Sequence, residues 1–442
     1  MTSGMSASRV HPFRTSAAKV VRGVVAATVL AVLCALGGGN GGCAVHEPAD
    51  PRRLLGEGGE NGAASNAAAP TIDWPARDVD RADNAIGMTP GVHKAFVAGM
   101  DMVDGQVKPY VWSVPVRVLS REKRGMGILC EVQRMDREVE PTDPRVFLFY
   151  SSGTPVASGN RTQGPPPPPG GELDRTPLDA VVVRVHPRLP GPQRGVAIAM
   201  RPLSGSAYTK STINALRHDG WTVIETGLSF GAEGIGEVRE ATTDADLDAV
   251  GGAVAALIDA RMAETAYGVE AVLEAVRSQR PDLTGKPVVI VGFSAGALGA
   301  PTVAARLHDQ VSAAVLVGGG VDLLRISQTS SLSDFGVVIR SGGEKLSPAQ
   351  IDRTSAAYLK ASRLDPYHTS RALSGVPVLL LHASQDDIVT TGELLHQRLG
   401  KPERWTFDIG HELLFWRLDA YDAEIAAWID RAITTQAGAR MH

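Results

Sequence analysis

The chain has 442 residues, enough for one large domain together with a smaller region. Its composition is that of an ordinary globular protein, with 43% hydrophobic and 21% charged residues. The formal net charge of −4 gives no basic footprint, which argues against a nucleic-acid-binding protein. No Walker loop, dinucleotide-binding loop or zinc-spaced group of histidines and cysteines is present in the sequence.

Residues 1–42 have the character of an export signal. Basic residues from Arg9 to Arg22 precede an uncharged, mostly apolar run from Gly23 to Leu36, which is short for a transmembrane helix. The small residue before Cys43 is similar to a bacterial lipoprotein processing site, although Asn40 stands where an aliphatic residue is usual. We expect a lipid on Cys43; simple secretion and an uncleaved anchor are the alternatives.

The segment 43–70 is predicted to be a flexible tether, because it is rich in small and polar residues and poor in large apolar ones. Cysteine placement agrees with an exported chain that has no disulfide. Cys34 lies in the apolar run and Cys43 at the processing site, which leaves Cys130 alone in the body of the chain. We interpret Cys130 as a packed small hydrophobic residue.

Residues 71–175 contain strand-like runs at 110–119 and 146–150, followed by a proline run at 164–171 that must be extended and exposed. This region is either a separate β-module with a stiff linker or the first strands of a larger sheet. The second alternative is favoured, because the apolar strand at 178–186 needs an antiparallel neighbour.

From residue 176 to 442, predicted strands and helices alternate. Apolar strands are expected at 195–200, 221–226, 287–291, 312–319, 376–382 and 405–409. Helices are expected at 211–218 and 297–307, with one or two alanine-rich helices over 246–278. Such alternation predicts an α/β fold with a mostly parallel, doubly wound sheet and helices on both faces.

A Gly-x-Ser-x-Gly pentapeptide at 292–296 joins one of these strands to the helix that follows it. A sharp strand–turn–helix connection of this kind presents the central serine, Ser294, at the tip of the sheet. The helix N-terminus behind it favours a developing negative charge.

Two further reactive side chains each follow a later strand. Asp386 comes after the strand at 376–382, and His411 comes after the strand at 405–409. The chain order serine, acid, histidine resembles that of the α/β-hydrolases. Over residues 178–435 the sequence is similar to the dienelactone-hydrolase and prolyl-oligopeptidase-like esterase branch of that superfamily.

The resemblance implies a role for each of these residues. Ser294 would be the nucleophile, His411 its general base, and Asp386 the carboxylate that orients the imidazole. Asp386 fits the branch's Gly-x-x-Asp-x-x-Val pattern, with Ala383 in the glycine position and Val389 at the end. The adjacent Asp387 is the alternative acid.

An oxyanion hole needs two backbone N–H donors. The resemblance implies Ala295 as one donor, and the loop after the strand at 195–200 as the source of the other. That loop begins Arg201-Pro202, where the family usually has His-Gly or Pro-Gly. Proline has no N–H, so Leu203 is the expected donor and Ser204 the second choice.

A cap over the site is expected at 326–375, and its weakly apolar composition argues against a large lipase lid. The sequence therefore predicts an exported, membrane-tethered serine hydrolase acting on a carboxylic ester in a small-molecule or acylated substrate. This mechanism needs no cofactor or metal. The alternatives are a peptidase of the same fold and a non-catalytic envelope lipoprotein that uses the fold as a binding scaffold.

Overall fold

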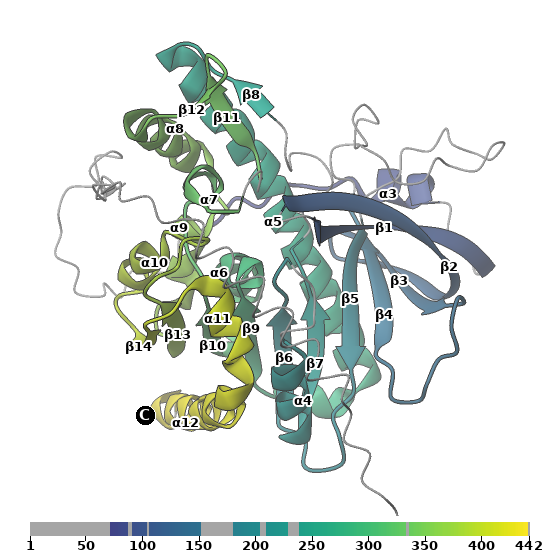
Figure 1. Ribbon diagram of the computed structural model, residues 1–442. Helices are drawn as coiled ribbons and strands as arrows, with labels where there is room; N and C mark the ends of the chain where they lie inside the picture. Colours follow the sequence, from purple (N-terminus) through teal and green to yellow (C-terminus); the bar gives the residue numbers. More distant parts are fainter. Residues whose placement is uncertain are drawn as a thin grey trace, which may run out of the picture. The chain divides into compact units, whose positions relative to one another are not determined.

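A computed structural model describes residues 71–86, 91–103, 106–151, 180–203, 209–228, 238–332 and 336–440 (Figure 1). The predicted signal, the predicted tether and the expected lipidation site Cys43 lie outside these residues, as does the proline run at 164–171. None of the helices in the described ranges has both the length and the apolar character that a membrane crossing requires.

Within the described ranges, one large sheet has the strand order β1-β2-β3-β4-β5-β7-β6-β9-β10-β13-β14. Its strands are β1 (Gly91–Val103), β2 (Gln106–Arg124), β3 (Gly127–Arg134), β4 (Arg145–Tyr150), β5 (Ala180–His186), β6 (Gly195–Met200), β7 (Trp221–Thr226), β9 (Val288–Phe293), β10 (Val311–Val317), β13 (Val378–Ala383) and β14 (Glu403–Phe407). From β7 to β14 all neighbouring strands are parallel. The predicted doubly wound sheet is thus confirmed.

The first five strands extend this sheet with antiparallel pairs. Strand β4 pairs with β5 from Arg145 opposite Val185 to Tyr150 opposite Ala180, and β5 is antiparallel to β7. The strands before residue 151 therefore lie in the same sheet as the later ones. Cys130 is fully buried among them, and burial raises the pKa of its thiol to about 11, so the thiol stays protonated.

Helices cover both faces of the sheet. The helices of the described ranges are α3 (Val79–Ile86), α4 (Lys210–His218), α5 (Asp244–Gln279), α6 (Ala295–Leu307), α7 (Leu323–Thr329), α8 (Pro348–Ala361), α9 (Pro366–Thr369), α10 (Gly392–Arg398), α11 (His411–Trp416) and α12 (Asp422–Arg440). Side chains of α5 and α6 pack on one face, and those of α4, α11 and α12 pack on the other. Strands β9 and β10 are buried throughout, as their continuous apolar sequences predict.

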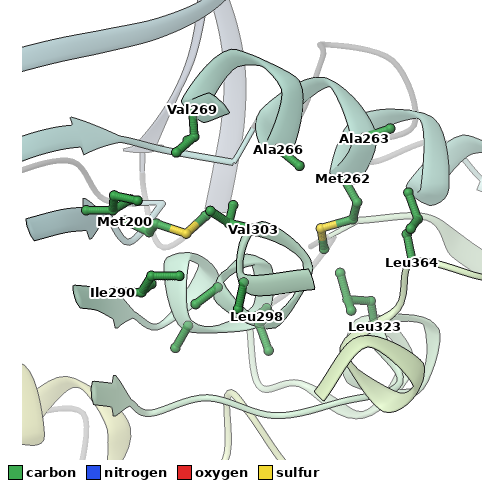
Figure 2. Packing of buried hydrophobic residues seen from close by; sticks show 14 of the residues in the cluster. Met200, Met262, Ala263, Ala266, Val269, Ile290, Leu298, Val303, Leu323 and Leu364 are labelled. Atoms are coloured by element: carbon green, nitrogen blue, oxygen red, sulfur yellow. The ribbon is translucent and has the colours of Figure 1, made fainter. Parts of the chain in front are cut away.

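Helix α6 forms the centre of the larger core. Figure 2 shows Leu298 and Val303 of α6 between Met200 and Ile290 of the sheet and Met262 of α5. Small side chains such as Ala266 let α5 approach α6 closely. The helix that follows Ser294 is thereby fixed on two sides.

The alanine-rich region forms one helix, α5, of 36 residues. Its start is set by a capping box, in which Thr243 and Asp246 each accept a hydrogen bond from the other's backbone N–H. The N-terminal part of α5 contacts α8, and Arg353 of α8 forms ion pairs with Asp244 and Asp248 of α5, both at 2.7 Å.

A second, three-stranded sheet is formed by short strands between residues 238 and 345. Its strands are β8 (Val238–Glu240), β11 (Val338–Ser341) and β12 (Glu344–Lys345), in the order β12-β11-β8. The expected cap segment, 326–375, supplies β11 and β12, whereas β8 comes from the connection between β7 and α5. The parallel pairing of β8 with β11 was not predicted, because three half-exposed residues carry no periodic signal.

The segment before α3 crosses the outside of α5 and α6. The Arg306 guanidinium of α6 lies 5.3 Å from the ring centroid of Trp74 and 5.0 Å from that of Tyr267. The Tyr267 hydroxyl donates a hydrogen bond to the carbonyl of Pro75. Residues 71–78 are called the N-terminal strap below.

Candidate active site

Ser294 occupies the sharp turn between β9 and α6. Its φ of 50° and ψ of −117° are rare for a residue with a side chain. Its N–H donates to the carbonyl of Val317 at the end of β10 (2.8 Å). Gly296 is required beside it, since a Cβ there would lie 2.0 Å from the carbonyl oxygen of Met200. The turn predicted from the pentapeptide is therefore present.

His411 is the first residue of α11 and follows the loop after β14. Its Nε2 lies 2.9 Å from the Oγ of Ser294, and its Nδ1 lies 2.7 Å from Oδ2 of Asp386. The side chains of His411 and Asp386 are only 6% and 5% exposed, which shields their contact from water. The three residues predicted from widely separated parts of the chain form one continuous hydrogen-bonded array.

Asp386 is held by the turn that follows β13. Its Oδ1 accepts the N–H groups of Ile388 (3.0 Å) and Val389 (2.7 Å), which leaves Oδ2 for His411. Asp387 is exposed, and its carbonyl accepts the N–H of Ser331 (2.8 Å). The structure therefore places Asp386, and not Asp387, against the imidazole.

The imidazole of His411 lies against Gly318 and the ring of Phe415. A Cβ on Gly318, whose φ is +59°, would lie 2.9 Å from Cε1 of His411. The Phe415 ring centroid lies 5.0 Å from that of His411, and Phe415 is buried. The next residue, Trp416, is 56% exposed.

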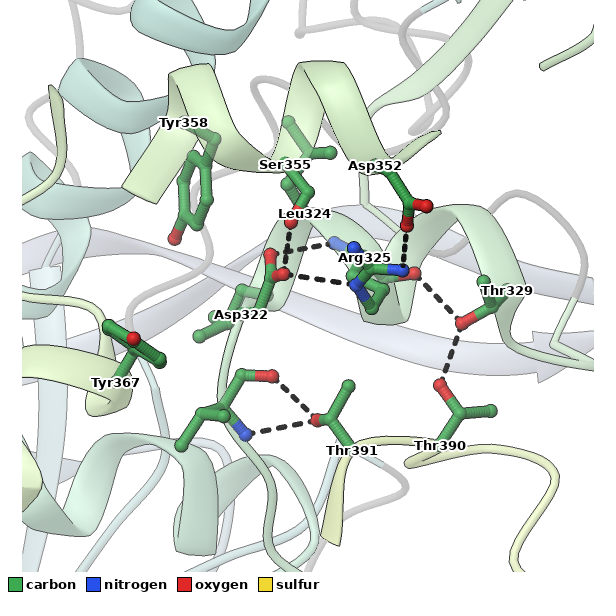
Figure 3. Close-up of polar contacts among 12 residues, drawn as sticks. Asp322, Leu324, Arg325, Thr329, Asp352, Ser355, Tyr358, Tyr367, Thr390 and Thr391 are labelled. Carbon is green, nitrogen blue, oxygen red and sulfur yellow. Dashed lines mark hydrogen bonds and ion pairs between the residues drawn. The ribbon is translucent and has the colours of Figure 1, made fainter. Parts of the chain in front are cut away.

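A buried polar network supports the loops on this side of the sheet (Figure 3). The Thr391 hydroxyl donates to the carbonyl of Val321 (2.6 Å) and accepts its N–H (3.0 Å). The next residue, Asp322, accepts hydrogen bonds from the backbone and side chain of Arg325 and from the hydroxyl of Ser355. The glycines after β10 are thus tied to the loop that carries Asp386.

The two candidate oxyanion donors lie on different elements. Ala295 is the first residue of α6, so its N–H is one of those at the helix start that no helical carbonyl accepts. Leu203 lies just beyond β6 and packs partly buried against the main core. Ser204, the second choice, lies outside the described residues.

In the described ranges, no group of three or more histidine, cysteine, aspartate or glutamate side chains is arranged to hold a metal ion. What the site offers is a serine, an imidazole and a carboxylate in hydrogen-bonded contact. That arrangement suits proton transfer to and from the serine hydroxyl.

No family model and no curated protein matches the sequence. Solved structures do match. Est1E from Butyrivibrio proteoclasticus is 14% identical, with a TM-score of 0.38, and the match covers 59% of this chain and 95% of that one. XC6422 from Xanthomonas campestris, an α/β serine hydrolase described as lacking a lid, is 15% identical at a TM-score of 0.34, covering 68% and 97%.

TT1662 from Thermus thermophilus is 18% identical at a TM-score of 0.33, covering 57% of this chain and 93% of that one. The chain has the α/β-hydrolase fold. Two features of this chain define that fold. The central part of the sheet is parallel with helices on both faces, and a serine lies at a strained turn between a central strand and the following helix.

Proposed function

We propose that this protein is a serine hydrolase that cleaves a carboxylic ester through an acyl-enzyme at Ser294. The observation that carries the proposal is the array in which His411 contacts Ser294 through Nε2 and Asp386 through Nδ1. A serine hydroxyl is a weak nucleophile at neutral pH, and a base within hydrogen-bond reach makes it reactive.

In the proposed reaction, the Ser294 Oγ attacks the acyl carbon while its proton passes to Nε2 of His411. The alkoxide leaves with that proton, and the acyl group stays on Ser294. Water then attacks the acyl carbon and gives a proton to Nε2 of His411. As the bond between the acyl carbon and Oγ breaks, His411 returns that proton to Oγ, which releases the acid and restores the free serine. Asp386 holds the Nδ1–H tautomer and stabilises the imidazolium of both steps.

Negative charge develops on the carbonyl oxygen in each step. We assign the N–H groups of Ala295 and Leu203 to this oxyanion, since one lies at the helix start and the other at the end of the neighbouring strand. Removing one such donor typically lowers kcat by about 10²–10³-fold.

The proposal is tested by treating the protein with a fluorophosphonate, in which the serine oxygen bonds to phosphorus and fluoride leaves. We expect stoichiometric labelling of wild type, none of Ser294→Ala, and full labelling of Ser278→Ala, which changes an exposed serine at the far end of α5. Hydrolysis of p-nitrophenyl butyrate should fall by about 10⁴-fold or more in Ser294→Ala only.

A p-nitroanilide with the same acyl group distinguishes ester from amide cleavage. Faster turnover of the anilide would identify a peptidase instead. A folded wild-type protein that neither takes up the label nor turns over either substrate would overturn the proposal and favour a binding scaffold.

A further inference from the structure

A cluster of ionisable side chains lies at the carboxyl ends of β6 and β7. Its centre is Glu225, which is 3% exposed. One carboxylate oxygen lies 2.6 Å from Nε2 of His186, and the other lies 3.3 Å from Nε of Arg201 and 3.8 Å from a guanidinium nitrogen of Arg184. Partners from β5 and from the loop after β6 therefore meet on one residue of β7.

A buried carboxylate destabilises the fold unless charged partners and hydrogen bonds compensate for its loss of water. Burial alone raises the pKa of Glu225. The hydrogen bond from His186 and the charges of Arg201 and Arg184 outweigh burial and hold the pKa below its usual value. The carboxylate is therefore ionised and can anchor a cation.

The anchored cation is the first residue of the loop to which we assign the second oxyanion donor. The N–H of Arg201 donates to the carbonyl of Thr226 at the end of β7 (2.7 Å). On the opposite side, the carbonyls of Met200 and Arg201 lie so close to Gly296 that a Cβ there would be 2.0 Å and 2.9 Å from their oxygens. Arg201 is thus held by β7, by Glu225 and by the start of α6.

We propose that Glu225 is a positioning residue: through its ion pair with Arg201 it fixes the loop that presents the N–H of Leu203 to the oxyanion. The inference rests on the proposed function. The side chain of Arg201 attaches the loop to Glu225 in addition to the backbone hydrogen bond. Pro202 has a fixed φ, which limits the torsional freedom between Arg201 and Leu203.

The consequence is geometric. An oxyanion donor acts at 2.7–3.1 Å in general, so a small displacement of the loop weakens it while substrate binding changes little. Loss of the anchor should therefore lower kcat and leave KM close to its wild-type value. The proton transfers through His411 should be unaffected, because the partners of Glu225 are Arg184, His186 and Arg201, which do not belong to the array of Asp386, His411 and Ser294.

The test compares Glu225→Gln with Glu274→Gln, which changes an exposed glutamate of α5. In Glu225→Gln we expect kcat for p-nitrophenyl butyrate to fall roughly ten- to a hundredfold, less than the loss of a whole donor. KM and the pH at which kcat is half-maximal should stay unchanged. Backbone hydrogen exchange at Leu203 should become faster, and Glu274→Gln should match wild type throughout.

Arg201→Lys covers the case in which Glu225→Gln does not fold. It keeps the charge but loses the guanidinium geometry, and we expect a partial loss of kcat in the same sense. Wild-type kcat in a folded Glu225→Gln or Arg201→Lys variant would overturn the inference alone, leaving the cluster a stabilising one. An inactive, unlabelled wild type would overturn the proposed function, and the inference with it.

Discussion

A single backbone torsion, the positive φ of Ser294, decides where the hydroxyl lies. Residues with a Cβ avoid this region, and the strain costs about 1–3 kcal/mol. It is tolerated because β9, β10 and α6 fix the turn from three directions. On the other side of the array, the absence of a side chain at Gly318 leaves space for the His411 imidazole. Glycine is the amino acid that adopts its φ of +59° without strain.

This dependence predicts the behaviour of Gly318→Ala. The matched control is Gly342→Ala, because Gly342 has φ +61° and nothing within 4 Å of the added Cβ. Both variants should lose about 1–2 kcal/mol of stability to left-handed strain. Only Gly318→Ala should also lose esterase activity, since its Cβ displaces the imidazole. Equal activities of the two variants, measured with p-nitrophenyl butyrate, would refute this account of His411.

Among single residues, the three reactive ones could be predicted from the sequence. The residues that position them or the neighbouring loop could not. Ser294 and Asp386 carry local patterns, and His411 follows a strand in the expected order. Gly318 and Glu225 carry no such pattern, because their roles depend on contacts with residues about 93 and 24 positions away in the chain. Only the folded sheet brings those partners together.

Among the elements, α7, α8 and α9 are joined by buried carboxylates rather than by apolar contact alone. Asp322 begins α7 and accepts from Ser355 of α8, and the N–H groups of Asp322 and Leu323 donate to Asp365, at the start of α9 (2.9 Å each). Tyr358 of α8 donates to the same carboxylate (2.7 Å). The network fixes the cap helices to the segment beneath His411.

Asp322 should make stability depend on pH. Burial raises its pKa to about 6, with Arg325 opposing and Asp365 adding to the shift. In the unfolded chain the carboxyl has its ordinary pKa of 3.8, so the folded protein binds this proton more tightly. The stability that comes from binding the proton is fully present below about pH 4 and is lost as the pH rises through about 6. Its size is at most about 3 kcal/mol.

The measurement is the thermal midpoint of wild type and Asp322→Asn between pH 4 and pH 7. Asparagine tolerates the left-handed conformation of Asp322 (φ 58°) and can still accept the N–H of Arg325. We expect the advantage of wild type over the variant to shrink as the pH rises. Asp282→Asn should run parallel to wild type, because Asp282 is 52% exposed and its partner, Arg280, keeps its charge throughout this range. A constant difference for Asp322→Asn would contradict the prediction.

The type and order of elements from β6 onward could be predicted because apolar strands and amphipathic helices differ in period. The elements of the segment 326–375, expected as a cap, could not be predicted in detail. The short strand β8 has little apolar content, and its pairing with β11 joins segments about 100 residues apart. Similarly, the sequence left open whether α5 was one helix or two, because continuous alanine-rich sequence has no internal stop signal.

For the molecule as a whole, the N-terminal strap matters because it closes the outer side of the α5–α6 pair. Trp74, Tyr267 and Arg306 form a stacked set, and Glu270 binds the same guanidinium at 2.8 Å. Arg77 of the strap donates to the carbonyl of Ala260 (2.8 Å). These contacts join the beginning of the described chain to the helix that starts at the active serine.

Trp74→Ala should therefore lower stability by about 1–3 kcal/mol without changing kcat at low temperature. The comparison variant is Trp416→Ala, which removes a tryptophan that is 56% exposed and should change stability little. Midpoints of thermal unfolding and residual esterase activity after heating measure both effects. A Trp74→Ala protein as stable as Trp416→Ala would show that the strap is not part of the stable core.

The strap also determines where mechanical load would enter the fold. Tension applied through the chain before Thr71 would reach Trp74 and then Arg306, at the C-terminal end of α6. That point lies about 18 Å along the helix from Ser294. A pull on Thr71 would thus load the aromatic and ionic contacts on the outside of α5 and α6 before it reached the turn at Ser294.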